Sequence, residues 1–228
     1  MPRVCWPADL IKTTEPKPLR CFHIQAHSAI ELTALPALAP VEGFIWIACD
    51  RSEFEAEQAR VQSALKAMAG VSLLDFHISD LRNNQLPSHF DYTSDYDVLV
   101  FRRLAAGSPE ADRLKADPAP SPPLKRGGPP ALRRIDTSPV GFVVLDRVLL
   151  SVHPQGCAAL EHHAQRLLAN PPGAVRNVGT YLPANPADLM LRVVSHMVDG
   201  YLDLRRELTR QLDHWQTELL KPRAKFQN

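Results

Sequence analysis

The feature that most constrains this sequence is a long helical pattern near its C-terminal end. Asn185-Pro186-Ala187-Asp188 is a typical helix start, with an asparagine cap, a proline in the first turn and an acid at the positive end of the helix dipole. No further proline follows before Pro222. Apolar residues recur on this segment at alternating spacings of four and three, broken only at Gln211: Met190, Val194, Met197, Tyr201, Leu204, Leu208, Trp215 and Leu219. This heptad pattern predicts one amphipathic helix over residues 185–221, about 50 Å long.

Such a helix is longer than a domain of this size needs. A helix that only crosses a sheet requires about 15 residues. We therefore expect a stalk or helical arm, and a core helix lying across a sheet is the alternative. The 228 residues are 45% hydrophobic and 22% charged, which is enough apolar material for one core.

Apolar runs upstream of this helix predict a sheet with helices around it. Strands are expected at 19–24, 43–49, 96–101, 140–145 and 148–152, of which the last two form a hairpin around Asp146-Arg147. Helices are expected at 52–69, 72–83 and 158–169. We expect a capping box of Ser52 and Glu55 to begin the first helix and Gly70 to end it. The segment 32–40 has no assignable pattern.

Prolines are concentrated in segments that lack periodicity. They number 21 of 228 residues, against about 5% in ordinary domains. Residues 1–18 are expected to form a flexible tail, and residues 105–139, which hold eight prolines, a disordered loop. The folded part is then expected over 19–184, followed by the arm helix over 185–221.

Composition excludes several functional classes. The net charge is +1, so bulk charge suggests no nucleic-acid partner. The four cysteines form no Cys-x-x-Cys pair, which excludes a zinc knuckle and a disulfide scaffold and favours a reducing cytosol. The longest apolar stretches, Gly43–Cys49 and Val140–Leu145, are shorter than the roughly 20 residues of a membrane span. We also expect no signal peptide.

Five motifs in order resemble the N-terminal cytoplasmic domain of CorA-type divalent-cation (magnesium/zinc) transporters. They are Gly43-Phe44-Ile45-Trp46-Ile47, His77-Ile78-Ser79-Asp80-Leu81-Arg82-Asn83, Pro87-Ser88-His89-Phe90-Asp91-Tyr92 leading into 96–101, Leu149-Leu150-Ser151-Val152, and the start of the long helix. The resemblance covers about residues 20–220 and depends on the order of motifs that are individually weak. It implies an α/β/α sandwich with a mixed parallel and antiparallel sheet, followed by a long C-terminal helix.

The resemblance also implies a function. The expected role is the cytosolic regulatory domain of a CorA-like transporter, at the cytoplasmic face of the inner (cell) membrane. The full-length homopentamer of such a protein transports Mg²⁺ and Co²⁺, or Zn²⁺, through a pore marked by Gly-Met-Asn. This sequence has neither that tripeptide nor a membrane span. Copies of the chain itself and divalent cations are therefore the expected partners, and the membrane would be reached only through further segments.

Asp80 is the candidate metal residue. In the family, an aspartate on the helix before the Tyr-led strand faces a neighbouring subunit and helps to bind a regulatory divalent ion, and Asp80 matches that position. The family motif has one more residue before its proline. We expect Mg²⁺, or Zn²⁺, to bind weakly here, because one carboxylate is a poor site without further ligands. The alternative is that Asp80 is a solvated acid on a helix surface.

Other chemistries have less support in the residues. The adjacent His162 and His163 point about 100° apart on a helix, so they do not chelate one ion as a pair. The sequence lacks Gly-x-Ser-x-Gly, a Gly-rich phosphate loop and His-Glu-x-x-His, so we expect no enzyme. A soluble α/β enzyme or ligand-binding domain is the competing hypothesis, and it requires a pocket at the carboxyl ends of the strands. The basic residues of 102–136 have no aromatic residues for base stacking, so no nucleic-acid partner is expected.

Overall fold

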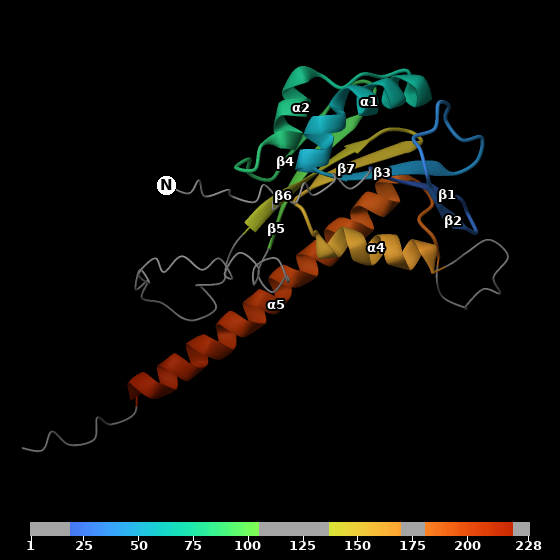
Figure 1. Cartoon of the computed structure of the whole chain (residues 1–228). Helices are drawn as coiled ribbons and strands as arrows, with labels where there is room; N and C mark the ends of the chain where they lie inside the picture. The colour runs from blue at the N-terminus through green and yellow to red at the C-terminus, as the bar shows by residue number, and fades with distance from the viewer. Residues whose placement is uncertain (1–18, 105–136, 170–180, 221–228) are drawn as a thin grey trace, which may run out of the picture.

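Seven strands form one mixed sheet in the computed structural model, which describes residues 19–104, 137–169 and 181–220. The strands are β1 (Arg20–Ile24), β2 (Ala29–Leu32), β3 (Phe44–Asp50), β4 (His89–Tyr92), β5 (Asp97–Leu104), β6 (Thr137–Val144) and β7 (Val148–His153). The helices are α1 (Arg51–Ala69), α2 (Asp75–Arg82), α4 (Ala158–Leu168) and α5 (Pro186–Leu220). The sheet order is β2-β1-β3-β7-β6-β5-β4, and β3 and β7 are parallel while the other neighbours are antiparallel. Helices α1 and α2 cover one face and α4 and α5 the other, which confirms the α/β fold with a mixed sheet and a long C-terminal helix (Figure 1).

Strand β3 lies inside the sheet between β1 and β7, and all seven of its residues are buried. Alternate side chains enter two separate cores: Ile45, Ile47 and Cys49 pack with α1 and α2, whereas Phe44, Trp46 and Ala48 pack with α4 and α5. This position explains the continuous apolar run that the sequence shows there.

The start of α1 differs from the prediction. Asp50 is the N-cap: its carboxylate accepts the Glu53 N–H at 2.8 Å, and the Glu53 carboxylate accepts the Asp50 N–H at 2.8 Å. The predicted box of Ser52 and Glu55 is wrong, because β3 continues to Asp50 and Ser52 already lies in the first helical turn. Gly70 ends the helix in the left-handed conformation, as predicted.

Two strands were not expected from the sequence. Strands β2 and β4 have four residues each and form the two edges of the sheet, where only one side needs a partner. Strand β6 begins at Thr137, inside the segment 105–139 that was expected to be a loop. The remainder of that segment and the predicted tail 1–18 lie outside the described residues. The division into a domain over 19–184 and an arm over 185–221 stays a prediction.

Helix α5 combines both predicted roles. It is one helix of 35 residues, and Asn185 caps it by accepting the Asp188 N–H at 2.8 Å. Its first half packs on the sheet through Leu189, Val193 and Met197, which are at most 4% exposed. The predicted stripe residues Met190 and Val194 are half-buried beside them.

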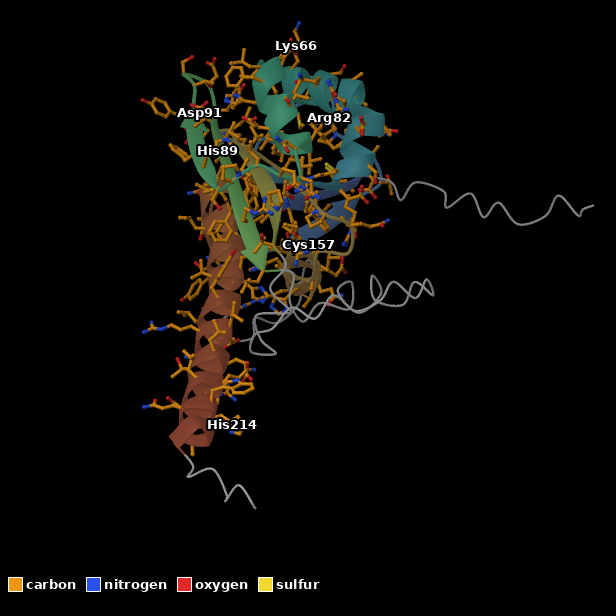
Figure 2. All side chains as sticks on the ribbon, turned by 90° about the vertical axis from the view of Figure 1, so that its left-hand side faces the viewer. Lys66, Arg82, His89, Asp91, Cys157 and His214 are labelled. Carbon is orange, nitrogen blue, oxygen red and sulfur yellow. The ribbon has the colours of Figure 1, made fainter. Side chains whose placement is uncertain are left out.

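The second half of α5 extends past the sheet (Figures 1 and 2). The hydroxyl of Tyr201 donates to the Arg102 carbonyl at 2.6 Å, close to the point where the helix leaves β5. Beyond it, Leu202, Leu212 and Trp215 are 44%, 61% and 48% exposed. None of the helices in the described ranges is apolar enough over a sufficient length to cross a bilayer.

Two glycines provide a test of the β1–β3 junction. Gly43 (φ +74°) and Gly70 (φ +72°) have the same left-handed backbone, but a Cβ at Gly43 would lie 2.0 Å from the Ile24 carbonyl oxygen, whereas at Gly70 nothing lies within 4 Å. Gly70→Ala is therefore expected to cost about 1 kcal/mol, from backbone strain alone. Gly43→Ala should cost at least about 2 kcal/mol more, because backbone atoms must move. Urea unfolding measures both, and equal costs would contradict the described junction.

Candidate functional site

The predicted metal residue, Asp80, lies on α2 beside the edge strand β4. Its carboxylate oxygen Oδ2 is 3.5 Å from Nε2 of His89, and both side chains are about a quarter exposed, at 27% and 29%. His89 is the first residue of β4. The structure thus brings Asp80 together with one of the two histidines that flank it in the sequence.

The other flanking histidine, His77, is fully buried one turn earlier on α2. Its Nε2 lies 3.2 Å from Asp91 Oδ2, and its Nδ1 lies 2.9 Å from the Tyr96 hydroxyl. A carboxylate only accepts, so a neutral His77 donates from Nε2 and accepts the Tyr96 O–H at Nδ1. The Tyr96 oxygen in turn accepts the Leu74 N–H at 3.0 Å.

This chain of hydrogen bonds attaches β4 to α2. The hydrogen bond from His77 is the main reason that the pKa of Asp91 lies below its usual value, and the Tyr92 N–H adds to the effect. Asp91 and His89 lie together at this end of the molecule (Figure 2). Across the described residues, no three histidine, cysteine or acidic side chains converge as a metal site. Asp80 therefore has one histidine neighbour, without a complete set of ligands from its own chain.

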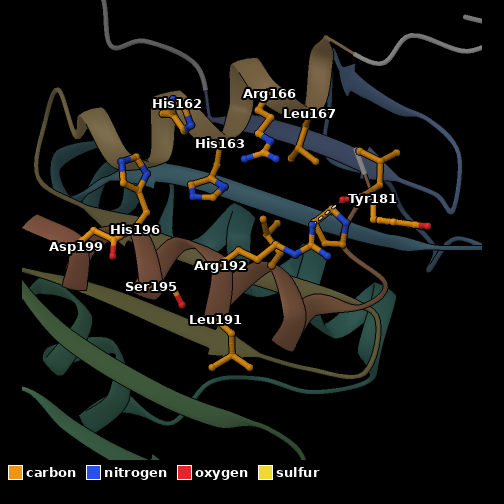
Figure 3. A pocket seen from close by; sticks show the side chains of 13 residues that line it. His162, His163, Arg166, Leu167, Tyr181, Leu191, Arg192, Ser195, His196 and Asp199 are labelled. Carbon is orange, nitrogen blue, oxygen red and sulfur yellow. Dashed lines mark hydrogen bonds between the residues drawn. The ribbon is translucent and has the colours of Figure 1, made fainter. Parts of the chain in front are cut away.

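A second group of polar side chains lines a cleft of about 570 Å³ between α4 and α5. We call it the α4–α5 cleft. Three histidine rings meet there, with centroid separations of 4.8 Å for His162–His196, 5.5 Å for His163–His196 and 5.6 Å for His162–His163 (Figure 3). The other lining residues are Arg166, Leu167, Tyr181, Leu182, Pro183, Leu189, Leu191, Arg192, Ser195 and Asp199.

Sequence reasoning missed this cleft, because it considered His162 and His163 only as a pair. The third ring, His196, comes from α5 and precedes the buried Met197 by one residue. The available signal was the position of His163, which lies on the buried face of α4 with Leu160, Ala164 and Leu167. A histidine on an apolar helix face needs a partner from the element that packs on it.

His163 has an unusual environment. It is 9% exposed, and its Nε2 atom is buried without a hydrogen-bond partner among the described residues. Burial is the main cause that lowers its pKa to about 4, and the nearby His196, His162, Arg166 and Arg192 lower it further. The imidazole is therefore neutral at physiological pH. An unsatisfied buried nitrogen of this kind costs about 1–3 kcal/mol.

Arg192 is held in one position at the other end of the cleft. Its guanidinium donates to both oxygens of Asp188 at 2.9 Å and to the Tyr181 carbonyl at 2.6 Å. The hydrogen bond from Arg192 is the main reason that the pKa of Asp188 lies below its usual value. Asp188 also accepts the Ala184 N–H at 2.9 Å. The ion pair of Asp188 and Arg192 within α5 is therefore hydrogen-bonded to the segment before the helix, at Tyr181 and Ala184.

The pKa of His163 predicts a pH dependence of stability. The unfolded chain takes up a proton near the ordinary pKa of 6.5, whereas the folded chain does so only near 4. Between these values the unfolded state binds more protons, so stability falls as the pH falls. Urea unfolding at about pH 8 and pH 5 should give a loss of about 1–2 kcal/mol from this group.

The loss should be smaller in His163→Leu, which removes the titrating group, and unchanged in His214→Gln, an exposed histidine near the far end of α5. An equal pH dependence in the wild type and in His163→Leu would contradict the lowered pKa.

No family model and no curated protein matches the sequence. The full-length CmaX protein is similar in structure, with a TM-score of 0.58 and 16% identity over 94% of this chain and 56% of that chain. The CorA magnesium transporter from Methanocaldococcus jannaschii matches with a TM-score of 0.55 and 13% identity, over 92% of this chain and 53% of that one.

A separate structure of the soluble domain of that CorA matches with a TM-score of 0.54 and 15% identity, over 90% of this chain and 66% of that chain. This chain thus spans between about half and two thirds of the length of these structures. The chain has the fold of a CorA-type N-terminal cytoplasmic domain.

Proposed function

We propose that this chain is the non-catalytic, cytosolic regulatory domain of a CorA-like divalent metal-ion transporter, at the cytoplasmic face of the cell membrane. The observation that carries the proposal is helix α5, in a fold shared with structures described as CmaX and as a CorA magnesium transporter. Its first half belongs to the core and its second half extends away from it (Figure 1). A helix built in this way is suited to connect a folded domain to another part of a larger assembly.

The competing hypothesis of an α/β enzyme finds less support. It requires a pocket beyond the carboxyl ends of parallel strands. In the described structure the parallel pair β3–β7 ends at Asp50 and His153, and Asp50 is occupied as the cap of α1. The α4–α5 cleft lies between helices on one face of the sheet instead.

The transport proposal is tested on the complete gene product. The reading frame continued past Asn228 should encode two apolar spans of about 20 residues each. Purified in liposomes, that product should carry Mg²⁺, Co²⁺ or Zn²⁺, as followed with an ion-sensitive dye inside the vesicles. A matched product truncated before the spans is the control for leakage. A reading frame without such spans would contradict the transport proposal.

Self-association belongs to the same proposal. Leu202, Leu212 and Trp215 leave apolar surface on the projecting half of α5, and surface of this kind on a helix favours contact with another copy or another helix. We propose that copies of this chain associate through this half of α5 and that the full-length protein is a homo-oligomer, a pentamer as the family resemblance implies.

Sedimentation velocity provides the test. The wild-type chain is expected to associate as its concentration rises, and Leu212→Glu with Trp215→Glu should weaken the association at least about tenfold, because charges would be buried in the contact. Thr209→Glu with Thr217→Glu adds the same charge at exposed polar positions of the helix and should have a smaller effect. A wild-type chain that stays monomeric and extended at all concentrations would contradict the proposal.

Asp80 is the proposed regulatory metal residue. Its carboxylate suits Mg²⁺ in a water-rich shell at a subunit boundary, while the nearby His89 nitrogen is a ligand type that Zn²⁺ accepts and Mg²⁺ does not. Because one carboxylate supplies few ligands, weak binding is expected.

Calorimetric titration with Mg²⁺ and with Zn²⁺ separates the two ions. Asp80→Asn should abolish the Mg²⁺ signal. The control is Asp95→Asn, an exposed acid beyond β4 whose carboxylate accepts a hydrogen bond from the Ser94 hydroxyl, and it should leave the signal unchanged. Tight, stoichiometric Zn²⁺ binding lost in His89→Gln would overturn the preference for Mg²⁺. Mg²⁺ binding that survives Asp80→Asn would remove Asp80 from the site.

A further inference from the structure

We propose that the contact between α4 and α5 is pH-sensitive: protonation of His163, whose ring lies against those of His162 and His196, releases α4 from the sheet and from the first half of α5. The contact then opens in acid while the rest of the fold remains. This inference goes beyond the transport proposal and does not depend on it, because it concerns only packing within this chain.

The geometry of the three rings carries the proposal. His162 and His163 belong to α4 and His196 belongs to α5, so the cluster spans the contact between the two helices (Figure 3). His162 and His196 are exposed, whereas Nε2 of His163 is buried without a hydrogen-bond partner among the described residues. In an imidazolium both ring nitrogens donate. A protonated His163 would therefore bury an unsatisfied donor and a charge for as long as α4 stays in place.

The charged groups of α4 and α5 around this ring do not offset an added proton. The charges that line the cleft, together with Asp188, balance at two positive and two negative: they are Arg166, Arg192, Asp188 and Asp199. Asp188 is paired with Arg192. Asp199 lies three residues after His196 on α5, where it is positioned to offset a charge on that ring. A proton on His163 is then an excess positive charge at the contact.

The acids on the other side of α4 are already paired. Glu161 of α4 and Glu31 of β2, the strand against which α4 packs, both form ion pairs with Arg20. In the described ranges, no carboxylate forms an ion pair with any of the three rings. A pKa of about 4 for His163, with burial as its main cause, agrees with this environment.

The attachment of α4 is small enough to open locally. Apart from His163, the buried side chains of this helix of 11 residues are Leu160, Ala164 and Leu167. The core that they join is separate from the core formed with α1 and α2 on the other face of the sheet. Single elements of a protein often open at a lower free energy than the whole fold. Helix α5 has its own contacts with the sheet, so release of α4 frees one side of its packed half.

Linkage gives the size of the effect. Between the pKa of about 4 in the closed state and the ordinary value of 6.5 in the open state, the open state binds more protons, so opening is favoured as the pH falls. For one such histidine, opening should be about thirtyfold more favourable at about pH 5 than at about pH 8. The effect should level off below about pH 4, where the closed state binds the proton as well.

The cysteines of the chain report this opening. Cys157 lies at the N-cap of α4 and is buried in the core shared with α5, whereas Cys21 and Cys49 are buried in the core on the other face of the sheet. The 228-residue chain is reacted at about pH 8 and at about pH 5 with dipyridyl disulfide, which modifies thiols in acid as well, and peptide mass spectrometry follows each cysteine. Rates are divided by those of the chain unfolded in urea at the same pH, which removes the effect of pH on the thiol itself.

We expect the normalised rate of Cys157 to rise about thirtyfold between the two pH values. At about pH 5 it should exceed the rate of Cys49 at least about tenfold, because release of α4 exposes Cys157 alone. In His163→Leu the rise should fall below about fivefold, since leucine keeps the apolar contact and does not titrate. His214→Gln changes a histidine near the far end of α5 and should behave as the wild type.

His196→Gln is a second variant, at an exposed position where folding is not at risk. It removes the neighbour that, after burial, most opposes the proton on His163, so the rise should shrink at least about twofold.

Three outcomes would overturn the proposal. Equal normalised rates for Cys157 and Cys49 at both pH values would mean that His163 is exposed only when the whole chain unfolds. An equal rise in the wild type and in His163→Leu would assign the pH effect to other groups. An unchanged rise in His196→Gln would contradict the role of the ring cluster.

Discussion

The structure depends on one constraint, which is that β3 is buried on both faces. Its odd and even side chains belong to two different cores, and Trp46 is fixed in the second of them by a hydrogen bond from Nε1 to Ser151 Oγ of β7 at 2.9 Å and by stacking on Phe22 at 4.8 Å. A strand of this kind requires a complete helical layer on each side of the sheet. Helices α1 and α2 form one layer, so α4 alone would leave the other incomplete, and the first half of α5 has to complete it.

Local sequence signals were sufficient to predict several parts of the fold. The apolar run of β3, the hairpin β6–β7 and the 35-residue α5 have strong periodicity or clear end signals such as Gly70 and Asn185. The edge strands β2 and β4 could not be predicted, because four residues paired on one side show little apolar patterning. The sequence pattern favours Ser52 as the cap of α1, whereas the structure has Asp50, because the exact end of β3 depends on its pairing with β7 up to His153.

The candidate sites were less predictable than the fold for the same reason. Asp80 could be identified by its motif, but its neighbour His89 depends on where the edge strand β4 places it. The α4–α5 cleft combines residues 162–166 with residues 192–199, and no local pattern connects them. Helix packing brings His196 to His162 and His163, so only the tertiary structure reveals the cluster.

The division of α5 into a packed half and a projecting half has a mechanical consequence. The packed half is fixed by Leu189, Val193 and Met197 and by the bond from Tyr201 to β5, while about 30 Å of helix continue beyond that point. A straight helix held at one end acts as a lever, so a tilt of about 5° at the sheet moves the far end by between 2 and 3 Å, roughly half a helical pitch. Gly200 lies at the fulcrum, where a Cβ would meet nothing within 4 Å. Packing does not require a glycine there, and a glycine softens a helix by about 1 kcal/mol relative to alanine. The least stiff residue of the lever therefore coincides with the point about which it would turn.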